Sequence, residues 1–280
     1  MKRYGDYTTL DAVRTSYLGS AATGQDTMLA DLIHSTSREM EDIAGRKFYP
    51  RIETRYFDTP SFYGVEQLWL DDDLLSLTTL MNGDGIEIPA AAYVLRPRNE
   101  SPKHSIELLM SSAYRWQITA AGDPQDAISV AGVWGYHSFY DGAWQDTLAT
   151  VQNDPLSSGG TSLTGLTTGK LHAGDMLLIE SEYIYVVSVT VSTTDTATIV
   201  RGIHGSTAAA HIKTTPIYRW THEEIEMLAR MAVAAYFRLR QNPIGDTVNI
   251  GGQTFSTPKD ITAWMTKRMT DLDLIWVRLS

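Results

Sequence analysis

The sequence predicts an α+β protein in which helices at both ends of the chain enclose two stretches of antiparallel β-structure. Apolar residues recur with a 3.6-residue period near the N-terminus, alternate with polar ones in the middle, and return to the helical period after residue 220. We therefore expect a helical body built from the N- and C-terminal helices, an antiparallel β-module and a second, small inserted β-domain. With 43% apolar and 20% charged residues in 280, the composition is that of a globular protein and argues against long disorder.

The first segment, residues 1–50, is expected to be helical. Residues 8–19 are expected to form a short helix, and the segment after the turn from Gly19 to Gly24 is the clearest helix of this part. Either Asp26 or Thr23 can cap its start, and Gly45 stands where a left-handed residue ends a helix. The apolar positions of this helix fall at spacings of three, four and seven: Met28, Leu29, Leu32, Ile33, Met40 and Ile43.

Residues 51–136 are expected to form an antiparallel β-module of five to seven strands. The alternation from Ile52 to Asp58 is typical of a half-buried strand, and Asn82-Gly83 is a strong hairpin signal. The other expected strands cover residues 68–70, 75–79, 86–88, 93–95, 106–109, 116–119 and 128–134.

The next part of the chain is predicted to be a linker followed by an insertion. Residues 137–165 look irregular, with Asp154-Pro155 and the run Ser157-Ser158-Gly159-Gly160 as loop signals. We assign residues 137–155 to a linker loop and residues 156–220 to an inserted small β-domain. Its expected strands are 176–179, 183–191, 196–201 and 217–220.

Helices are expected again in residues 221–280. Thr221-His222-Glu223-Glu224 fits a capping box in which Glu224 reaches back, and Asn242-Pro243 ends that helix. A second helix is expected to start at Thr257-Pro258, with proline at its first position. Residues 272–279 fit either more helix or an extended arm.

The charge and the cysteine content exclude several classes of protein. Lys and Arg total 23 against 33 Asp and Glu, a formal charge of −10, whereas proteins that grip nucleic-acid phosphates usually carry a basic surplus. The chain has no cysteine, so disulfides, cysteine zinc sites and thiol nucleophiles are excluded. No apolar run approaches the ~20 residues that span a bilayer, so we expect a soluble protein used inside the cell, with no membrane partner.

The sequence contains no supported catalytic motif. Gly169-Lys170 lacks the remaining positions of a phosphate-binding loop, since residue 164 is Thr and residue 171 is Leu. Neither a dinucleotide-binding GxGxxG nor a GxSxG nucleophile elbow occurs. We therefore expect no enzyme and no cofactor.

Two features are candidates for metal binding, and for both the structural interpretation is favoured. His204 and His211 lie seven residues apart in a predicted loop but have no evident third ligand, so local hydrogen bonds are the better explanation. The run Asp71-Asp72-Asp73 offers oxygen ligands, but a solvated charge run at a strand end explains it better.

Aromatic residues cluster between Trp134 and Trp144, with Tyr136, Tyr140 and His137 between them. They could stack on a sugar or on a partner protein. The favoured interpretation is that Trp134 and Tyr136 end a strand and fill the edge of the core.

Several segments, in this order along the chain, resemble head–tail connector (adaptor) proteins of tailed bacteriophages. The helix end Ile43-Ala44-Gly45-Arg46-Lys47-Phe48-Tyr49-Pro50 is similar to that of the family, and the residues from Val200 to His211 are similar to an "RG..GT.aa.H" signature of small β-modules in virion proteins, with Ser206 as a departure. The strand segments that resemble longer members of the family are 54–58, 68–75 and 128–136.

The resemblance implies a non-enzymatic virion protein at the head–tail interface, made in the cytoplasm of a host bacterium. Such adaptors form a ring, usually of twelve copies, between the portal protein and the next neck, stopper or tail protein, and they enclose DNA without reading its sequence. It also implies that the C-terminal segment docks into the portal.

The C-terminus of this chain is apolar apart from Arg278, which is unusual for a free end. We expect residues 271–280 to be buried against the portal or a neighbouring copy. The predicted contact residues are Leu272, Leu274, Ile275, Trp276, Val277, Arg278 and Leu279. The alternative function is a receptor- or carbohydrate-binding virion protein that uses residues 156–220 and the aromatic residues from Trp134 to Trp144.

Overall fold

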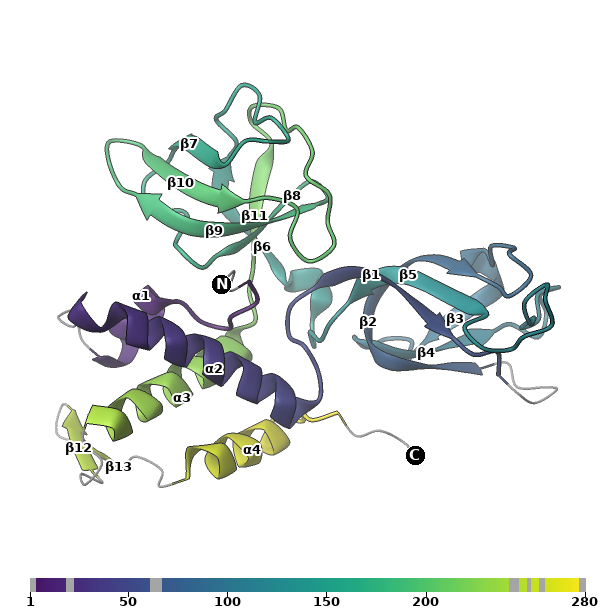
Figure 1. Cartoon of the computed structure of the whole chain (residues 1–280), viewed down its shortest axis with the longest axis horizontal. Coiled ribbons are helices and arrows are strands. Elements are labelled where there is room, and N and C mark those ends of the chain that lie inside the picture. Colours follow the sequence, from purple (N-terminus) through teal and green to yellow (C-terminus); the bar gives the residue numbers. More distant parts are fainter. Residues whose placement is uncertain are drawn as a thin grey trace. The chain divides into compact units, whose positions relative to one another are not determined.

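The computed structural model describes residues 4–18, 23–60, 67–241, 247–250, 253–256 and 260–276 (Figure 1). In these ranges the chain is mixed α/β, with four α-helices, antiparallel sheets of five and six strands, and a two-stranded hairpin. It divides into two compact units. The helix–sheet unit comprises Met1–Arg46, Trp144–Ile203 and Thr207–Ser280, and the five-stranded unit comprises Lys47–Ala143 and His204–Ser206.

The helices of the helix–sheet unit come from both ends of the sequence. They are α1 (Leu10–Val13), α2 (Asp26–Ala44), α3 (Glu223–Gln241) and α4 (Ile261–Asp271). As expected, α2 ends at Gly45, whose φ of 66° is the left-handed conformation that glycine adopts without strain. Helices α1, α2 and α3 share one apolar cluster of buried residues: Val13, Leu29, Ile33, Val233 and Phe237.

Helix α4 joins α2 and α3 through a polar contact as well as through buried side chains. The Tyr236 hydroxyl of α3 donates to Glu39 of α2 at 2.8 Å, and the Thr262 hydroxyl of α4 donates to the same carboxylate at 2.6 Å. Burial, together with the nearby Glu39 carboxylate, raises the pKa of Tyr236 to about 12. Asp260 caps α4 by accepting from the Ala263 amide, so the helix begins one residue beyond it.

The five-stranded sheet has the order β1-β5-β2-β4-β3 and is antiparallel throughout. The long strand β2 pairs with β4 through its first half and with β5 through its second. The register shifts within both pairings, between Trp69 and Leu74 in the first and between Leu74 and Thr79 in the second. The strands are β1 (Arg51–Phe57), β2 (Gln67–Met81), β3 (Tyr93–Arg96), β4 (Lys103–Leu108) and β5 (Ile128–Trp134). Their buried residues form one core that includes Phe57, Leu74, Leu80, Ile106 and Trp134.

The six-stranded sheet has the order β6-β11-β8-β9-β10-β7 and its own apolar core. The strands are β6 (Trp144–Thr150), β7 (Ser162–Leu166), β8 (Met176–Ile179), β9 (Glu182–Thr190), β10 (Asp195–Val200) and β11 (Pro216–Trp220). The side chain of Asn153 donates to the Ser162 carbonyl and accepts from the Thr164 amide, so it pairs with the outer edge of β7 like a short piece of backbone.

The prediction of an irregular segment over residues 137–165, including the 137–155 linker loop, is wrong where β6 and β7 lie. Strand β6 carries a bulge at Leu148, which has a φ of 58° and is exposed between the buried Thr147 and Ala149, so the apolar and polar residues of the sequence do not follow the burial pattern of a strand. The sequence pattern of a strand is therefore lost although the pairing with β11 remains.

The expected strand over 116–119 is also absent from the described structure. The side chain of Asn82 donates to the Arg115 carbonyl and accepts from the Gln117 amide, so backbone groups that a strand would use are already engaged. The turn at Asn82-Gly83 does form, with the Asn82 amide donating to the Ile86 carbonyl. The strand expected to return over 86–88 is reduced to a single bridge between Met81 and Glu87.

Two expected helix caps differ in detail. The residue that reaches back at the start of α3 is Glu226, which accepts from the His222 amide, rather than Glu224. The N-cap residue of α2 is Gln25 rather than Thr23 or Asp26, and the Gln25 side chain makes no capping hydrogen bond.

Near the C-terminus, a hairpin of β12 (Thr247–Ile250) and β13 (Gln253–Ser256) was not anticipated, and residues 257–259 lie outside the described residues. After α4 ends at Asp271, residues 272–276 form a turn and a bend in which the Leu274 amide donates to the Met269 carbonyl, so they are neither more helix nor an extended arm. In the described residues, no helix is both long and apolar enough to cross a membrane.

Candidate functional site

A network of five charged side chains lies on the five-stranded sheet, and we call Arg51, Glu53, Arg55, Asp71 and Asp72 the charged seam. The three residues from β1 alternate along the strand on the same face as the buried Phe57, so they point toward the core side of the sheet. The two aspartates come from β2, within its register shift between Trp69 and Leu74. The seam therefore joins an edge strand to the bend of the longest strand.

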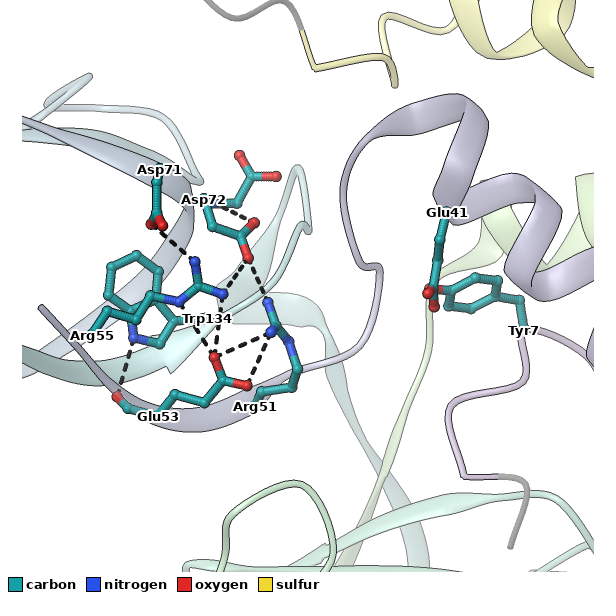
Figure 2. A network of polar contacts seen from close by, with 9 residues as sticks. Tyr7, Glu41, Arg51, Glu53, Arg55, Asp71, Asp72 and Trp134 are labelled. Atoms are coloured by element: carbon teal, nitrogen blue, oxygen red, sulfur yellow. Dashed lines mark hydrogen bonds and ion pairs between the residues drawn. The ribbon is translucent and has the colours of Figure 1, made fainter. Parts of the chain in front are cut away.

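Asp72 is the centre of the charged seam. Its Oδ2 accepts from Arg51 at 2.6 Å and from Arg55 at 2.7 Å, and Figure 2 shows both guanidinium groups pointing at it. Asp71 accepts from Arg55 at 2.9 Å, and Glu53 accepts from both arginines. Because each carboxylate of the seam is engaged by arginine, the arrangement ties β1 to β2.

Trp134 lies under the charged seam and is fully buried. Its indole N–H donates to the Glu53 carbonyl at 3.1 Å, and the Arg55 guanidinium lies 4.7 Å from the ring centroid. Burial alone lowers the pKa of Arg55, but the carboxylates of Asp72, Asp71 and Glu53 outweigh it, so the net shift is upward.

The expectation that Asp71-Asp72-Asp73 is a solvated run at a strand end is wrong. The run lies inside β2, and Asp73 has none of its surface exposed. His104 Nε2 lies 3.3 Å from Asp73 Oδ1. Composition alone favours solvent for a run of like charges, and the arginines 16 and 21 residues away in sequence explain why Asp71 and Asp72 can be partly buried.

A second polar network, which we call the Glu182 clamp, lies in the helix–sheet unit and consists of Glu182, Arg201, His211 and two backbone amides. Glu182 is fully buried at the start of β9, and Arg201 donates to its two oxygens at 2.6 Å each. The amides of Gly202 and Ala209 donate to the same carboxylate at 3.0 and 3.1 Å. His211 Nε2 lies 2.8 Å from it.

The Glu182 clamp fastens the loop after β10 onto the turn between β8 and β9. Arg201 also donates to the carbonyls of Ser157 and Ala209, and His211 Nδ1 lies 2.8 Å from Glu180. Burial by itself raises the pKa of Glu182, but the hydrogen bonds from Arg201, Ala209 and His211 more than offset it and lower the pKa. Four residues of the "RG..GT.aa.H" pattern, Arg201, Gly202, Ala209 and His211, thus meet around one carboxylate and fix the loop that carries them.

The two histidines considered as a metal pair have separate surroundings. His211 is held by the clamp, whereas the His204 ring lies 4.4 Å from Tyr49 and its carbonyl accepts from the Ile52 amide within the five-stranded unit. Across the described residues, no group of three or more His, Asp or Glu side chains is arranged to hold a metal.

Two further carboxyl groups have perturbed pKa values that sequence reasoning did not predict. Burial raises the pKa of Asp175 and of Glu226. Asp175 accepts from the His172 amide at 2.7 Å, and Glu226 accepts from the His222 amide at 3.1 Å. Each carboxyl group satisfies a backbone donor at a turn or a helix start, which explains its position without a catalytic role.

The predicted C-terminal contact residues differ in how far the structure buries them. Leu274 is buried in its own chain with 1% exposure, and Leu272, Ile275 and Trp276 are half-buried. The Trp276 amide donates to the Ala44 carbonyl at 2.7 Å, and the Trp276 ring lies 5.1 Å from the Arg46 guanidinium. Val277, Arg278 and Leu279 lie outside the described residues.

The aromatic residues from Trp134 to Trp144 belong to two different units. Trp134 is in the core of the five-stranded unit, in agreement with the favoured interpretation, and Tyr136 packs on Phe48. Trp144 belongs to the helix–sheet unit, where its ring stacks on Tyr183 at 5.4 Å and meets Trp220 at 5.0 Å.

No protein-family model matches this chain, and no curated protein matches it.

Sequence reasoning missed Glu182, the residue around which the most elaborate polar network forms. The available signal was an acidic residue directly before the apolar run of β9, at the position where a strand begins. Nothing in that signal identifies Arg201 and His211 as its partners, because they lie 19 and 29 residues away in sequence.

Proposed function

We propose that this protein is a structural virion protein that joins the portal of a tailed bacteriophage to its tail or neck, as a ring-forming head-to-tail adaptor. The resemblance of the segments around Ile43–Pro50 and Val200–His211 to that family supports the proposal. In this interpretation the two ends of the chain form the adaptor's helical body, and the small β-domain is an insertion into it.

The observation that carries the proposal is that helices from opposite ends of the sequence share one core and leave an apolar segment beyond α4. Val13, Leu29 and Val233 lie in the same buried cluster, and Glu39 binds hydroxyl groups of both α3 and α4. A body closed in this way allows the β-structure to vary without moving the helices or the C-terminal segment. A ring also needs two different self-contacting surfaces on each copy.

The partners in this proposal are the portal protein, neighbouring copies in a ring, usually twelve, and the next neck, stopper or tail protein. DNA passes through the ring without being read. The formal charge of −10 on each chain suits a conduit, because an acidic channel wall repels the phosphate backbone. The protein would be made in the host cytoplasm and would end in the virion, and no catalytic step is part of this role.

The first test is to silence the gene during infection and to image the particles that form. The proposal expects filled or leaking heads beside separate, finished tails, and expects a wild-type copy supplied in trans to restore joined particles. Complete particles that merely fail to adsorb to cells would overturn the proposal.

The alternative, a receptor- or carbohydrate-binding virion protein, is favoured by one observation. Trp144 and Trp220 are half-buried neighbours on the six-stranded sheet, and aromatic rings are the usual platform for sugars. Trp134 cannot contribute, because it is fully buried. Saturable binding on a glycan array that is lost in Trp144→Ala would support this alternative, and an adaptor predicts none.

A further inference from the structure

Strand β1 is an edge strand of the five-stranded sheet and pairs with β5 on one side. The register with β5 runs without interruption along the whole strand, so alternate residues turn their backbone N–H and C=O groups away from the sheet. Ile52 is one of these residues, because its amide donates to the His204 carbonyl at 2.9 Å. Thr54 and Tyr56 continue the same alternation, so their backbone groups also point outward from the edge.

The outer edge of β1 is open beyond Ile52. The segment His204–Ser206 covers the edge at Ile52, where a Cβ added at Gly205 would overlap the Ile52 carbonyl oxygen. Among the described residues, none hydrogen-bonds to the outward backbone groups of Thr54 and Tyr56, which we call the open edge. A row of unpaired N–H and C=O groups is a template for a further strand. The edge therefore accepts an added segment at one end and leaves room for another.

The face of the sheet away from the core presents apolar surface beside the open edge. The side chains of Ile52, Thr54 and Tyr56 project from this face, since they alternate with the residues that face the core. All three are exposed, Tyr56 with 62% of its surface. Their partners across β5 are small or apolar: Val133, Ala131 and Ser129. A side chain laid over this face therefore gains most from being apolar.

The opposite face presents negative charge beside the same edge. The charged seam lies on this face, and its three carboxylates outnumber its two guanidinium groups. The two arginines are mostly buried, whereas Glu53 on β1 and Asp71 keep about a third or more of their side chains exposed. In Figure 2 the Glu53 carboxylate reaches both arginines from β1. The part of the seam that solvent reaches is therefore mainly acidic, and a basic side chain on a neighbouring strand complements it.

We propose that the open edge binds an extended segment of a partner protein in which basic and apolar residues alternate. The segment adds antiparallel to β1, in the same way as every other strand of this sheet pairs with its neighbour. Main-chain hydrogen bonds to Thr54 and Tyr56 attach it, and the chemistry of the two faces selects its side chains. This recognition is independent of the proposed adaptor function.

The basic and apolar side chains of the segment have separate places in such a complex. A residue opposite Thr54 or Tyr56 turns its N–H toward β1 and its side chain to the apolar face. The next residue turns its N–H away from β1, and its Cβ lies about 5 Å from that of Glu53. A basic residue pairs with the Glu53 carboxylate in that position. An acidic residue is repelled there, and an apolar one takes water from charged groups without replacing it.

The first experiment uses the isolated full-length protein and a fluorescent peptide in which valine and lysine alternate. The peptide is N-methylated at its lysines, whose N–H groups point away from β1, so that it cannot pair with a second peptide. We expect saturable binding by anisotropy. The same peptide N-methylated at its valines should bind at least tenfold more weakly, because it has lost the N–H groups that donate to Thr54 and Tyr56. Equal binding of the two peptides, or no binding of either, overturns the proposal.

Variants of the protein and of the peptide test the position and the charge. Thr54→Pro removes an outward N–H without removing a bond to β5, so it should lower the affinity at least tenfold. Thr54→Val keeps the N–H and should bind within about twofold of the wild-type protein. A peptide with glutamate in place of lysine should bind at least tenfold more weakly. Binding that survives Thr54→Pro or the glutamate exchange overturns the proposal, and if Thr54→Pro does not fold, the two methylated peptides still decide.

Hydrogen exchange tests the open edge without any variant. In the free protein the amides of Thr54 and Tyr56 should exchange at least tenfold faster than those of Glu53 and Arg55, which bond to β5. The lysine–valine peptide should then slow the exchange of Thr54 and Tyr56 at least tenfold. If these two amides are already protected in the free protein, the edge is covered and the proposal is wrong.

A second copy of this chain is the competing occupant of the open edge. We expect sedimentation of the wild-type protein to be unchanged by Thr54→Pro. Self-association that Thr54→Pro abolishes would show that β1 pairs with another β1, and would overturn the basic and apolar partner. None of these measurements depends on the particles formed when the gene is silenced, so this proposal and the adaptor function fail separately.

Discussion

The Glu182 clamp and the charged seam each build a network from carboxylates and arginines, but they differ in burial and in what they hold. In the clamp, Glu182 and His211 are almost without exposed surface, and backbone amides complete the hydrogen bonding of the carboxylate. In the charged seam, the side chains of Glu53 and Asp71 are 35% and 64% exposed, and one backbone amide, that of Asp73, donates to Asp72.

The difference shows how many hydrogen-bond partners must replace water before a charged side chain can be buried. Glu182 accepts from a bidentate arginine, two amides and an imidazole, so the loss of water is compensated in full. The seam needs less compensation because water still reaches it. We therefore expect the clamp to be far more sensitive to the loss of one charge than the seam.

The largest effect is expected for Glu182→Gln, which removes the charge and keeps the shape. The variant should lose about 3–5 kcal/mol of unfolding free energy, because Arg201 is left buried without its ionic partner. Urea denaturation measures the loss, and faster hydrogen exchange at the Gly202 and Ala209 amides would locate it. The matched control is Glu180→Gln, whose exposed side chain should cost less than about 1 kcal/mol. Equal losses in the two variants would contradict the comparison.

The second prediction concerns acid. The folded-state pKa of Glu182 is lowered, so its stabilising contribution is present above the unfolded value of about 4.3 and is lost as the pH falls through the folded value. The gap in stability between the wild-type protein and Glu182→Gln should therefore be constant near neutral pH and narrow below about pH 4. The raised pKa values of Asp175 and Glu226 act in the opposite direction, but they are present in both proteins and cancel in the difference. A gap that widens in acid would show that Glu182 is not ionised in the clamp.

The third prediction is a smaller loss in the charged seam. Asp72→Asn weakens the contacts to both Arg51 and Arg55 and should cost about 1–2 kcal/mol, since the carboxylate is mostly buried but water remains close. The neighbouring Asp71→Asn removes one exposed contact and should cost less than about 0.5 kcal/mol. Urea denaturation of both variants checks the order of the two losses. A larger loss for Asp71→Asn would show that Asp72 is not the centre of the charged seam.

The smallest effect is the response to salt. At 1 M NaCl the screening length falls to about 3 Å, so the cost of Asp72→Asn should shrink by roughly half. The cost of Glu182→Gln should stay nearly constant, because the clamp is closed to water. Equal salt responses in the two variants would mean that the two networks have the same access to solvent.

The local parts of the fold could be predicted from the sequence. Helix α2 and its end at Gly45 follow from periodicity and one glycine, and β1 and β5 follow from alternation, because these signals lie within the segment itself. Strand β6 could not be predicted because it exposes its leucine, Leu148, and buries its threonine, Thr147, on the two faces of the strand. The strand prediction for 116–119 fails because a distant side chain, Asn82, engages its backbone.

The sequence by itself therefore determined the class of fold and most of the helices and strands. It also singled out the C-terminal segment and the Val200–His211 pattern as segments of interest. Only the tertiary structure decided that Arg201 and His211 meet at Glu182, that Asp72 lies between two arginines, and that Trp276 rests on the end of α2. The physical reason is that helix and strand signals depend on neighbours a few residues apart, whereas the partner of a buried charge or ring is set by how whole elements pack.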